Sequence, residues 1–191
     1  MKCSIKKSTY KAIYRLLDRV SPVDYDCGTL CGAACCTCGG DSVDEDGLDY
    51  ELGMYLLPGE EKIFTKNEDW LKWSREDSLD YDFPDSWFGD VYFIRCKTPP
   101  ICERNMRPMQ CRTFPLEPHI TEDGILHMII STAELPYQCP LIYDEMELNS
   151  SFIKATYTVW KHLIRDRLIY DLVKMDSEFR IDEGSNIKII I

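Results

Sequence analysis

The chain has 191 residues, of which 45% are hydrophobic and 29% are charged, so it is long enough for one folded domain and too apolar for a disordered protein. The net charge of −11 is concentrated in residues 41–90, which hold 16 acidic and 4 basic side chains. This charge excludes an ordinary nucleic-acid surface, because phosphate backbones are repelled. The acidic stretch is either a solvated surface or a docking surface for a basic protein partner.

The first twenty residues lack the features of a secretory signal. Lys11, Arg15 and Asp18 interrupt the apolar positions that follow the early lysines. A signal peptide needs an unbroken apolar run of about seven or more residues, and a membrane span needs roughly 18. The sequence offers neither run, so we expect a cytoplasmic protein without a membrane partner.

Apolar residues at helical spacing predict a helix near each end of the chain. The first covers residues 8–20, with Ser8 or Thr9 near its N-cap, and ends before Ser21-Pro22. The second covers residues 149–175 and begins at a group of N-cap candidates. The apolar face of the first helix comprises Tyr10, Ile13, Leu16, Leu17 and Val20, and that of the second comprises Phe152, Val159, Trp160, Leu163, Ile164, Leu168, Leu172 and Val173.

Between these helices the pattern indicates short elements and long loops. Residues 56–60 predict a turn that leads into a short helix reaching about Trp73. The aromatic residues within 81–88 predict a loop laid over the core, and residues 91–95 favour a strand that arrives at Cys96.

A β-hairpin is predicted from residues 111–120 and 125–131, because Asp123-Gly124 is a strong turn signal between two strand-like segments. Two prolines restrict its first arm to an edge or a distorted strand. A smaller closing hairpin is expected between residues 179 and 191, around Gly184.

These elements predict one compact, cysteine-rich α+β domain over residues 1–191. It has N- and C-terminal helices, a small β-hairpin and long loops. The stretch 22–40 is rich in glycine and cysteine and poor in large apolar residues. We therefore expect a metal to organise such loops in place of apolar packing.

The ten cysteines indicate metal binding rather than disulfide bonds. In a reducing compartment, clustered thiols bind metal or carry out redox chemistry. Zinc and iron–sulfur sites need thiolates aimed at one point by a tightly turning backbone, and small residues permit such turns. Two groups have this character: Cys27-Gly-Thr-Leu-Cys31-Gly-Ala-Ala-Cys35-Cys36, and downstream Cys102-Glu-Arg-Asn-Met-Arg107-Pro108-Met-Gln-Cys111-Arg112-Thr-Phe114-Pro115.

This pattern resembles the YkgJ-type cysteine-cluster family, described as zinc- or iron-chelating domains. The resemblance spans residues 27–140. In the first cluster, the gaps from Cys27 to Cys31 and from Cys31 to Cys35 are each one residue longer than in the family. The second group matches the family pattern Cys-x4-Arg-Pro-x2-Cys-Arg-x-(Phe/Tyr)-Pro at every fixed position: Cys102, Arg107, Pro108, Cys111, Arg112, Phe114 and Pro115.

The resemblance implies a set of metal ligands and a cofactor, either zinc or an iron–sulfur cluster. Eight thiolates exceed one tetrahedral site, so either two centres exist or some cysteines lie outside the ligand shell. Cys38 is a possible replacement ligand, and we expect Cys3 to be a spectator. The implied metal ligands are Cys27, Cys31, Cys35, Cys36, Cys96, Cys102, Cys111 and Cys139.

Arg107 and Arg112 are expected to lie beside the cofactor. A guanidinium offsets the negative charge of bound thiolates and donates hydrogen bonds to sulfur. The alternative is an ordinary salt bridge to Glu103 or Glu117. His119 and His127 are expected to be ordinary histidines, because the predicted turn falls between them.

The expected function is metal binding, with the metal structural or carried as cargo. The sequence holds no nucleophile elbow, His-Glu-x-x-His motif or phosphate-binding loop. Two alternatives stay open. One is an iron–sulfur-dependent enzyme similar to flagellin lysine methylases, which resemble the cluster. The other is a redox or metal sensor that acts through the acidic partner-binding surface.

Overall fold

The computed structural model describes residues 2–37, 54–97, 104–144 and 146–191. It mixes helices with small antiparallel sheets, which confirms the α+β class. Within these residues no helix is both long enough and apolar enough to cross a bilayer. The elements in chain order are α1 (Lys7–Leu17), α2 (Gly28–Cys31), α3 (Ala34–Thr37), β1 (Met54–Tyr55), η1 (Glu60–Lys62), β2 (Leu71–Asp77), η2 (Ser78–Asp80), β3 (Asp90–Cys96), η3 (Arg104–Met106), α4 (Met109–Thr113), β4 (Leu116–Ile120), β5 (Leu126–Ile130), α5 (Pro140–Tyr143), α6 (Ser150–Leu163) and α7 (Arg167–Asp182).

The predicted first helix is present as α1, with a different buried face. It begins at Lys7, and its N-cap residue makes no side-chain hydrogen bond. Leu16 is exposed, because adjacent helix positions point about 100° apart and Leu16 therefore lies at the edge of the face that contains Tyr10 and Leu17. The buried face comprises Tyr10, Ile13, Tyr14 and Leu17.

The prediction of a short helix that reaches Trp73 is wrong. The helical turn η1 ends at Lys62, and Trp73 lies in strand β2. Strand β2 pairs with β3 in a sheet of order β1-β3-β2, with Trp73 opposite Ile94. Leu71, Ile94 and Phe64 are buried together in a small second core. Pairing with the distant strand β3 therefore overrides the local helical pattern.

The predicted hairpin is confirmed as β4 and β5, and the predicted strand before Cys96 is confirmed as β3. The first arm of the hairpin starts only at Leu116, because residues 109–113 form the helix α4. The prediction of a closing hairpin near the C-terminus is wrong. Phe179 and Ile181 belong to α7, and Ile189 forms a bridge with Ile129, so the tail extends the hairpin instead.

The predicted long C-terminal helix is two helices, α6 and α7. The backbone leaves the helical path around Asp166, whose side chain accepts a hydrogen bond from Leu168 N at 3.0 Å and so caps α7. The same carboxylate accepts hydrogen bonds from Ser4 N at 2.7 Å and Ser4 Oγ at 2.6 Å. Asp166 therefore lies at the break between α6 and α7, where it caps α7 and also binds the N-terminal segment through Ser4.

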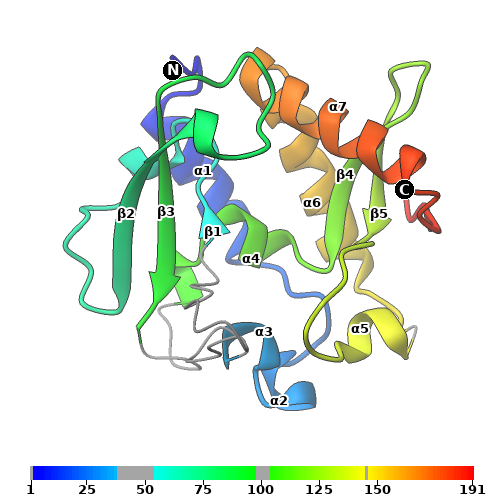
Figure 1. Cartoon of the computed structure of the whole chain (residues 1–191). Coiled ribbons are helices and arrows are strands. Elements are labelled where there is room, and N and C mark those ends of the chain that lie inside the picture. Colours follow the sequence, from blue (N-terminus) through cyan, green and yellow to red (C-terminus); the bar gives the residue numbers. More distant parts are fainter. Residues whose placement is uncertain (1, 38–53, 98–103, 145) are drawn as a thin grey trace, which may run out of the picture.

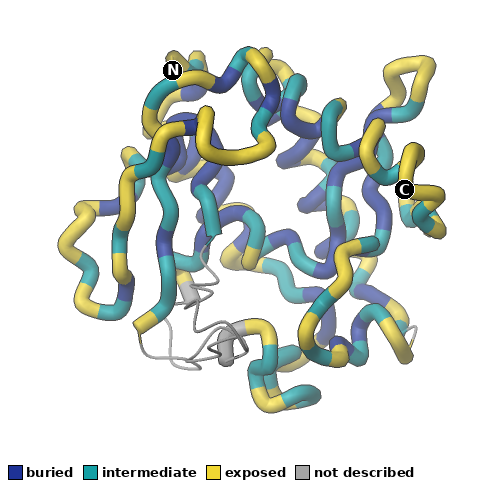
Figure 2. The backbone as a smooth tube through the Cα atoms, viewed as in Figure 1, coloured by how far each residue is buried: buried dark blue, intermediate teal, exposed yellow. Residues whose placement is uncertain are grey.

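The main core lies between α1, α6, α7 and the hairpin, where α7 packs on β4 and α6 packs on both hairpin strands (Figure 1). In Figure 2, many of the buried positions, drawn in dark blue, lie on these elements. The connection from β2 to β3 closes over the core through Trp87, as expected for the aromatic loop. Residues 22–37 were expected to be irregular, but they contain the helical turns α2 and α3.

Candidate metal centre

The described predicted ligands lie on five separate elements. Cys27 immediately precedes α2 and Cys31 ends it, while Cys35 lies in α3. Cys96 ends β3, Cys111 is the middle residue of α4, and Cys139 immediately precedes α5. In Figure 1, α2, α3, α5 and the Cys96 end of β3 all lie toward the same end of the molecule. We call this end the cysteine end.

Three predicted positions cannot be placed in the same way. Cys102 and Cys38 lie outside the described residues. Cys36 belongs to α3, but its side chain is outside the description. Two members of the expected ligand set, Cys36 and Cys102, are therefore left untested.

Cys27 and Cys111, far apart in the chain, line one small cavity of about 100 Å³. Arg107 and Arg112 line the same cavity. The two cysteine groups that the sequence separates therefore meet here, and both predicted arginines accompany them. The remaining lining residues are Leu17, Asp18, Val20, Ser21, Pro22 and Phe114.

Arg112 is buried beside these thiols, with 4% of its side chain exposed. Its Nη1 lies 2.6 Å from Asp18 Oδ1, and its guanidinium carbon lies 4.1 Å from the centre of the Tyr14 ring. Its Nε donates a hydrogen bond to the carbonyl of Arg107. Asp18 was not among the partners considered from the sequence. Of the two glutamates that were, Glu117 pairs with Arg180 at 2.9 Å, and Glu103 lies outside the described residues.

A buried carboxylate holds the other end of α4. Glu60 accepts hydrogen bonds from Tyr14 Oη at 2.5 Å, from Met109 N at 2.7 Å and from Leu57 N at 3.0 Å. Burial raises the pKa of Glu60, although these donors and Arg112 oppose the rise. Since Met109 begins α4 and Arg112 anchors its last turn, the position of Cys111 is fixed from both sides.

This support of α4 has no recognisable signature in the sequence. Glu60 reads as a turn residue after Pro58-Gly59, and Asp18 reads as a solvated position on α1. Neither residue has a local motif that reveals its partner. Only the packing of α1 against residues distant in the chain brings Tyr14 and Asp18 to α4.

The remaining described cysteines are linked to this region by two further contacts. Cys111 Sγ lies 3.8 Å from Met54 Sδ, and Met54 pairs with Ile94 two residues before Cys96. Cys96 packs on the same second core as Met54. Cys111 is therefore close to the end of the sheet that carries Cys96.

Cys139 and Cys31 form the other link. Cys139 is buried, and its burial raises the pKa of the thiol. The nearby charge of Cys31 raises this pKa further, so the two sulfurs interact electrostatically. Cys139 without a cation nearby thus stays a protonated thiol at neutral pH.

Among the side chains that the structure describes, no three histidine, cysteine, aspartate or glutamate residues converge as a ready-made metal site. His119 and His127 stand directly opposite each other in the hairpin register, a juxtaposition that the sequence did not suggest. Burial lowers the pKa of His119, and the neighbouring Arg180 and His127 lower it further. This pair lies on the hairpin and is not among the residues that line the cavity of Cys27 and Cys111.

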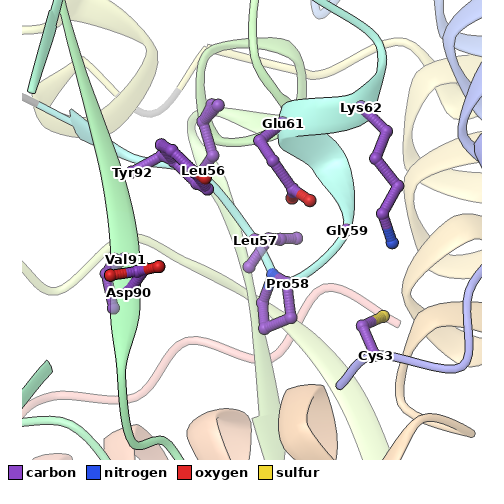
Figure 3. A pocket seen from close by; sticks show the side chains of 10 residues that line it. All are labelled: Cys3, Leu56, Leu57, Pro58, Gly59, Glu61, Lys62, Asp90, Val91 and Tyr92. Carbon is purple, nitrogen blue, oxygen red and sulfur yellow. The ribbon is translucent and has the colours of Figure 1, made fainter. Parts of the chain in front are cut away.

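Cys3 lies in a different cavity, of about 170 Å³, beside the turn at Pro58-Gly59 (Figure 3). Figure 3 shows its thiol on the same side of the cavity as the Lys62 amine. Burial raises the pKa of Cys3 to about 12, and Asp166 adds to the rise. The separate cavity is the feature that distinguishes Cys3 from Cys27 and Cys111, and its expected spectator role stays a prediction.

Comparisons with known proteins give no relative from which a function can be transferred. No family model matches the chain, and neither the curated proteins nor the solved structures contain a match. The resemblance to the YkgJ-type family therefore stays an expectation that rests on the motif residues alone.

Proposed function

We propose that this protein binds zinc or an iron–sulfur cluster through its cysteines, and that the metal is structural or is carried as cargo. The observation that carries the proposal is the cavity in which Cys27 and Cys111 meet Arg107 and Arg112. Two cysteines and two arginines from distant parts of the chain line one small cavity. The motif residues of the YkgJ-type resemblance predict the same four positions.

The electrostatics of this cavity suit metal-bound thiolates. The positive charge of a guanidinium stabilises a neighbouring thiolate and offsets the excess negative charge of a multi-thiolate site. Arg112 is held in place by Asp18 and Tyr14, so its charge stays beside the cavity. A side chain that is already held in place loses less conformational entropy when it stabilises a bound thiolate than a mobile surface lysine would lose.

The exposure of helix α2 supports a structural role for the metal. Helix α2 has four residues and buries none of them. Helical turns of this length are not stable by themselves, because helix nucleation is unfavourable. A metal bound by Cys27 and Cys31 would supply the free energy that apolar contacts do not supply here. Cys36 and Cys102 are proposed to complete the ligand set.

The proposal is tested by purifying the protein without oxygen, recording its visible spectrum and measuring bound metals and acid-labile sulfide. A brown protein with iron and sulfide indicates an iron–sulfur cluster, and a colourless protein with zinc indicates structural zinc. Wild-type protein with neither metal, isolated from cells supplied with both, would sink the proposal.

Matched serine variants locate the site. Cys27→Ser and Cys111→Ser are expected to lose most of the bound metal, whereas Cys3→Ser should keep it, because Cys3 lies in a separate cavity. Equal metal loss in all three variants would show that the cavity shared by Cys27 and Cys111 is not the binding site.

A further inference from the structure

Large apolar side chains are exposed on the connection between β2 and β3, residues 78–89, which we call the 78–89 loop. Leu79 is 79% exposed, Phe88 68% and Tyr81 44%. The loop joins the last residue of β2 to the first residue of β3, so it lies at the opposite end of the sheet from Cys96 (Figure 1). Clustered apolar exposure of this kind marks surfaces that bind partners.

The loop is held firmly from within. Ser78 N donates to the Gly89 carbonyl at 3.0 Å, and Ser78 Oγ donates to the Trp87 carbonyl at 3.0 Å. Trp87 is buried, and its Nε1 donates to the carbonyl of Leu168 at 2.8 Å. The inner aromatic residues therefore anchor the loop to the core, while the outer residues project from a fixed base. A surface that is already ordered loses little entropy on binding.

Carboxylates alternate with these exposed apolar residues along the chain. Residues 76–90 contain six acidic residues and no basic residue. Asp80, Asp82 and Asp85 are exposed on the loop itself. The protein as a whole carries a charge of −11, so the local and the global fields have the same sign. Such a field accelerates the encounter with a cationic partner and repels an anionic one.

We infer that the 78–89 loop is a docking surface for a basic protein segment that carries apolar anchors among its lysines and arginines. The exposed apolar residues supply contact area, and the carboxylates favour a positively charged partner. A second copy of this chain fits poorly because both copies carry −11, and nucleic acids and anionic membranes are repelled in the same way. The inference does not depend on bound metal.

Two synthetic peptides test the chemistry. One is an amphipathic helix of lysine and leucine, and the other is a lysine–glutamine peptide of the same length and charge. Fluorescence anisotropy titrations with the full chain are expected to show at least about tenfold tighter binding of the lysine–leucine peptide, weakened by added salt. Equal affinity for the two peptides would overturn the inference, because charge alone would then explain binding.

Paired variants locate the surface on the protein. Leu79→Ser with Phe88→Ser is expected to weaken binding of the lysine–leucine peptide by about tenfold, since truncation of apolar anchors has the largest effects at interfaces. The matched control is Ile125→Ser with Phe179→Ser, which removes two similarly exposed apolar side chains elsewhere. Comparable weakening in the control pair would assign the binding to general surface hydrophobicity and refute the docking surface.

A second pair tests the charge. Asp82→Asn with Asp85→Asn should weaken peptide binding, whereas Asp182→Asn with Glu183→Gln makes the same change in net charge at the end of α7 and should leave it nearly unchanged. All of these positions are exposed, so the thermal midpoint should stay close to that of the wild type. Identical effects of the two charge pairs would also refute the inference.

Discussion

Helix α6 buries six residues and packs against α1 and both hairpin strands, whereas α2 at the cysteine end buries none. The first region is held by removal of apolar surface from water, the dominant source of folding free energy. The second region has cysteines where the first has leucine, phenylalanine and tryptophan. A helix that buries none of its residues needs another source of stability, and thiolate–metal bonds are one that needs few residues.

Polar side chains connect the two regions through α4. Glu60 and Arg112 hold the two ends of α4, and both contact α1 through Tyr14. Helix α1 belongs to the main core. The core therefore supplies a fixed base from which α4 presents Cys111, so the comparison between the regions can be tested by disturbing each one separately.

Removal of the proposed metal is expected to have the largest effect, confined to the cysteine end. Structural zinc sites supply on the order of 10 kcal/mol of apparent binding energy. Treatment with a chelator should therefore abolish hydrogen-exchange protection of backbone amides in residues 27–37, while amides in α6 keep theirs. Simultaneous loss of protection in both regions would show that the two regions are not separately stabilised.

Truncation of the core is expected to have the next largest effect. Phe152 is buried in α6, and Phe152→Ala should lower the free energy of unfolding by about 3–5 kcal/mol through lost burial and a residual cavity. Urea denaturation should give the same loss with and without chelator. The exposed Phe179 offers a control, because Phe179→Ala should change the free energy by less than about 0.5 kcal/mol. A chelator-dependent loss for Phe152→Ala would contradict the comparison.

Breaking the link between the regions should have an intermediate effect. Asp18→Asn removes the carboxylate that neutralises the buried guanidinium of Arg112 and should cost about 1–3 kcal/mol, reduced from the value for a fully buried pair because Asp18 is partly exposed. Metal content should also fall, since α4 carries Cys111. Asp90→Asn breaks the exposed pair with Arg75 and should change both quantities little. If Asp90→Asn lowers metal content as much as Asp18→Asn, the link plays no special role.

The smallest effect is expected from a carboxyl group on α7. Burial raises the pKa of Asp176 from 3.8 to about 6, and Glu117 adds to the rise while Arg180 opposes it. The folded state then holds this proton more tightly than the unfolded state, so stability falls as pH rises from 3.8 to about 6. Asp176→Asn should flatten this decline in urea denaturation curves, whereas Asp182→Asn at the exposed end of the helix should leave it unchanged. An unaltered pH profile in Asp176→Asn would refute the assignment.

Local signals in the sequence determined several elements correctly. Asp123-Gly124 predicted the hairpin because a tight turn depends on residues adjacent in the chain. The spacing of Tyr10, Ile13 and Leu17 predicted α1 because one helix face is defined by positions three and four residues apart.

Contacts between distant residues decided the rest. Residues 71–77 are a strand because β3 supplies their hydrogen-bond partners. The C-terminal helix breaks near Asp166, whose carboxylate caps α7 and also binds the distant Ser4. The cavity shared by Cys27 and Cys111, and the burial of Arg112 against Asp18, depend on how α1 meets α4. Sequence patterns report periodicity over a few residues, whereas these contacts join positions tens of residues apart, whose pairing is set by packing of the whole chain.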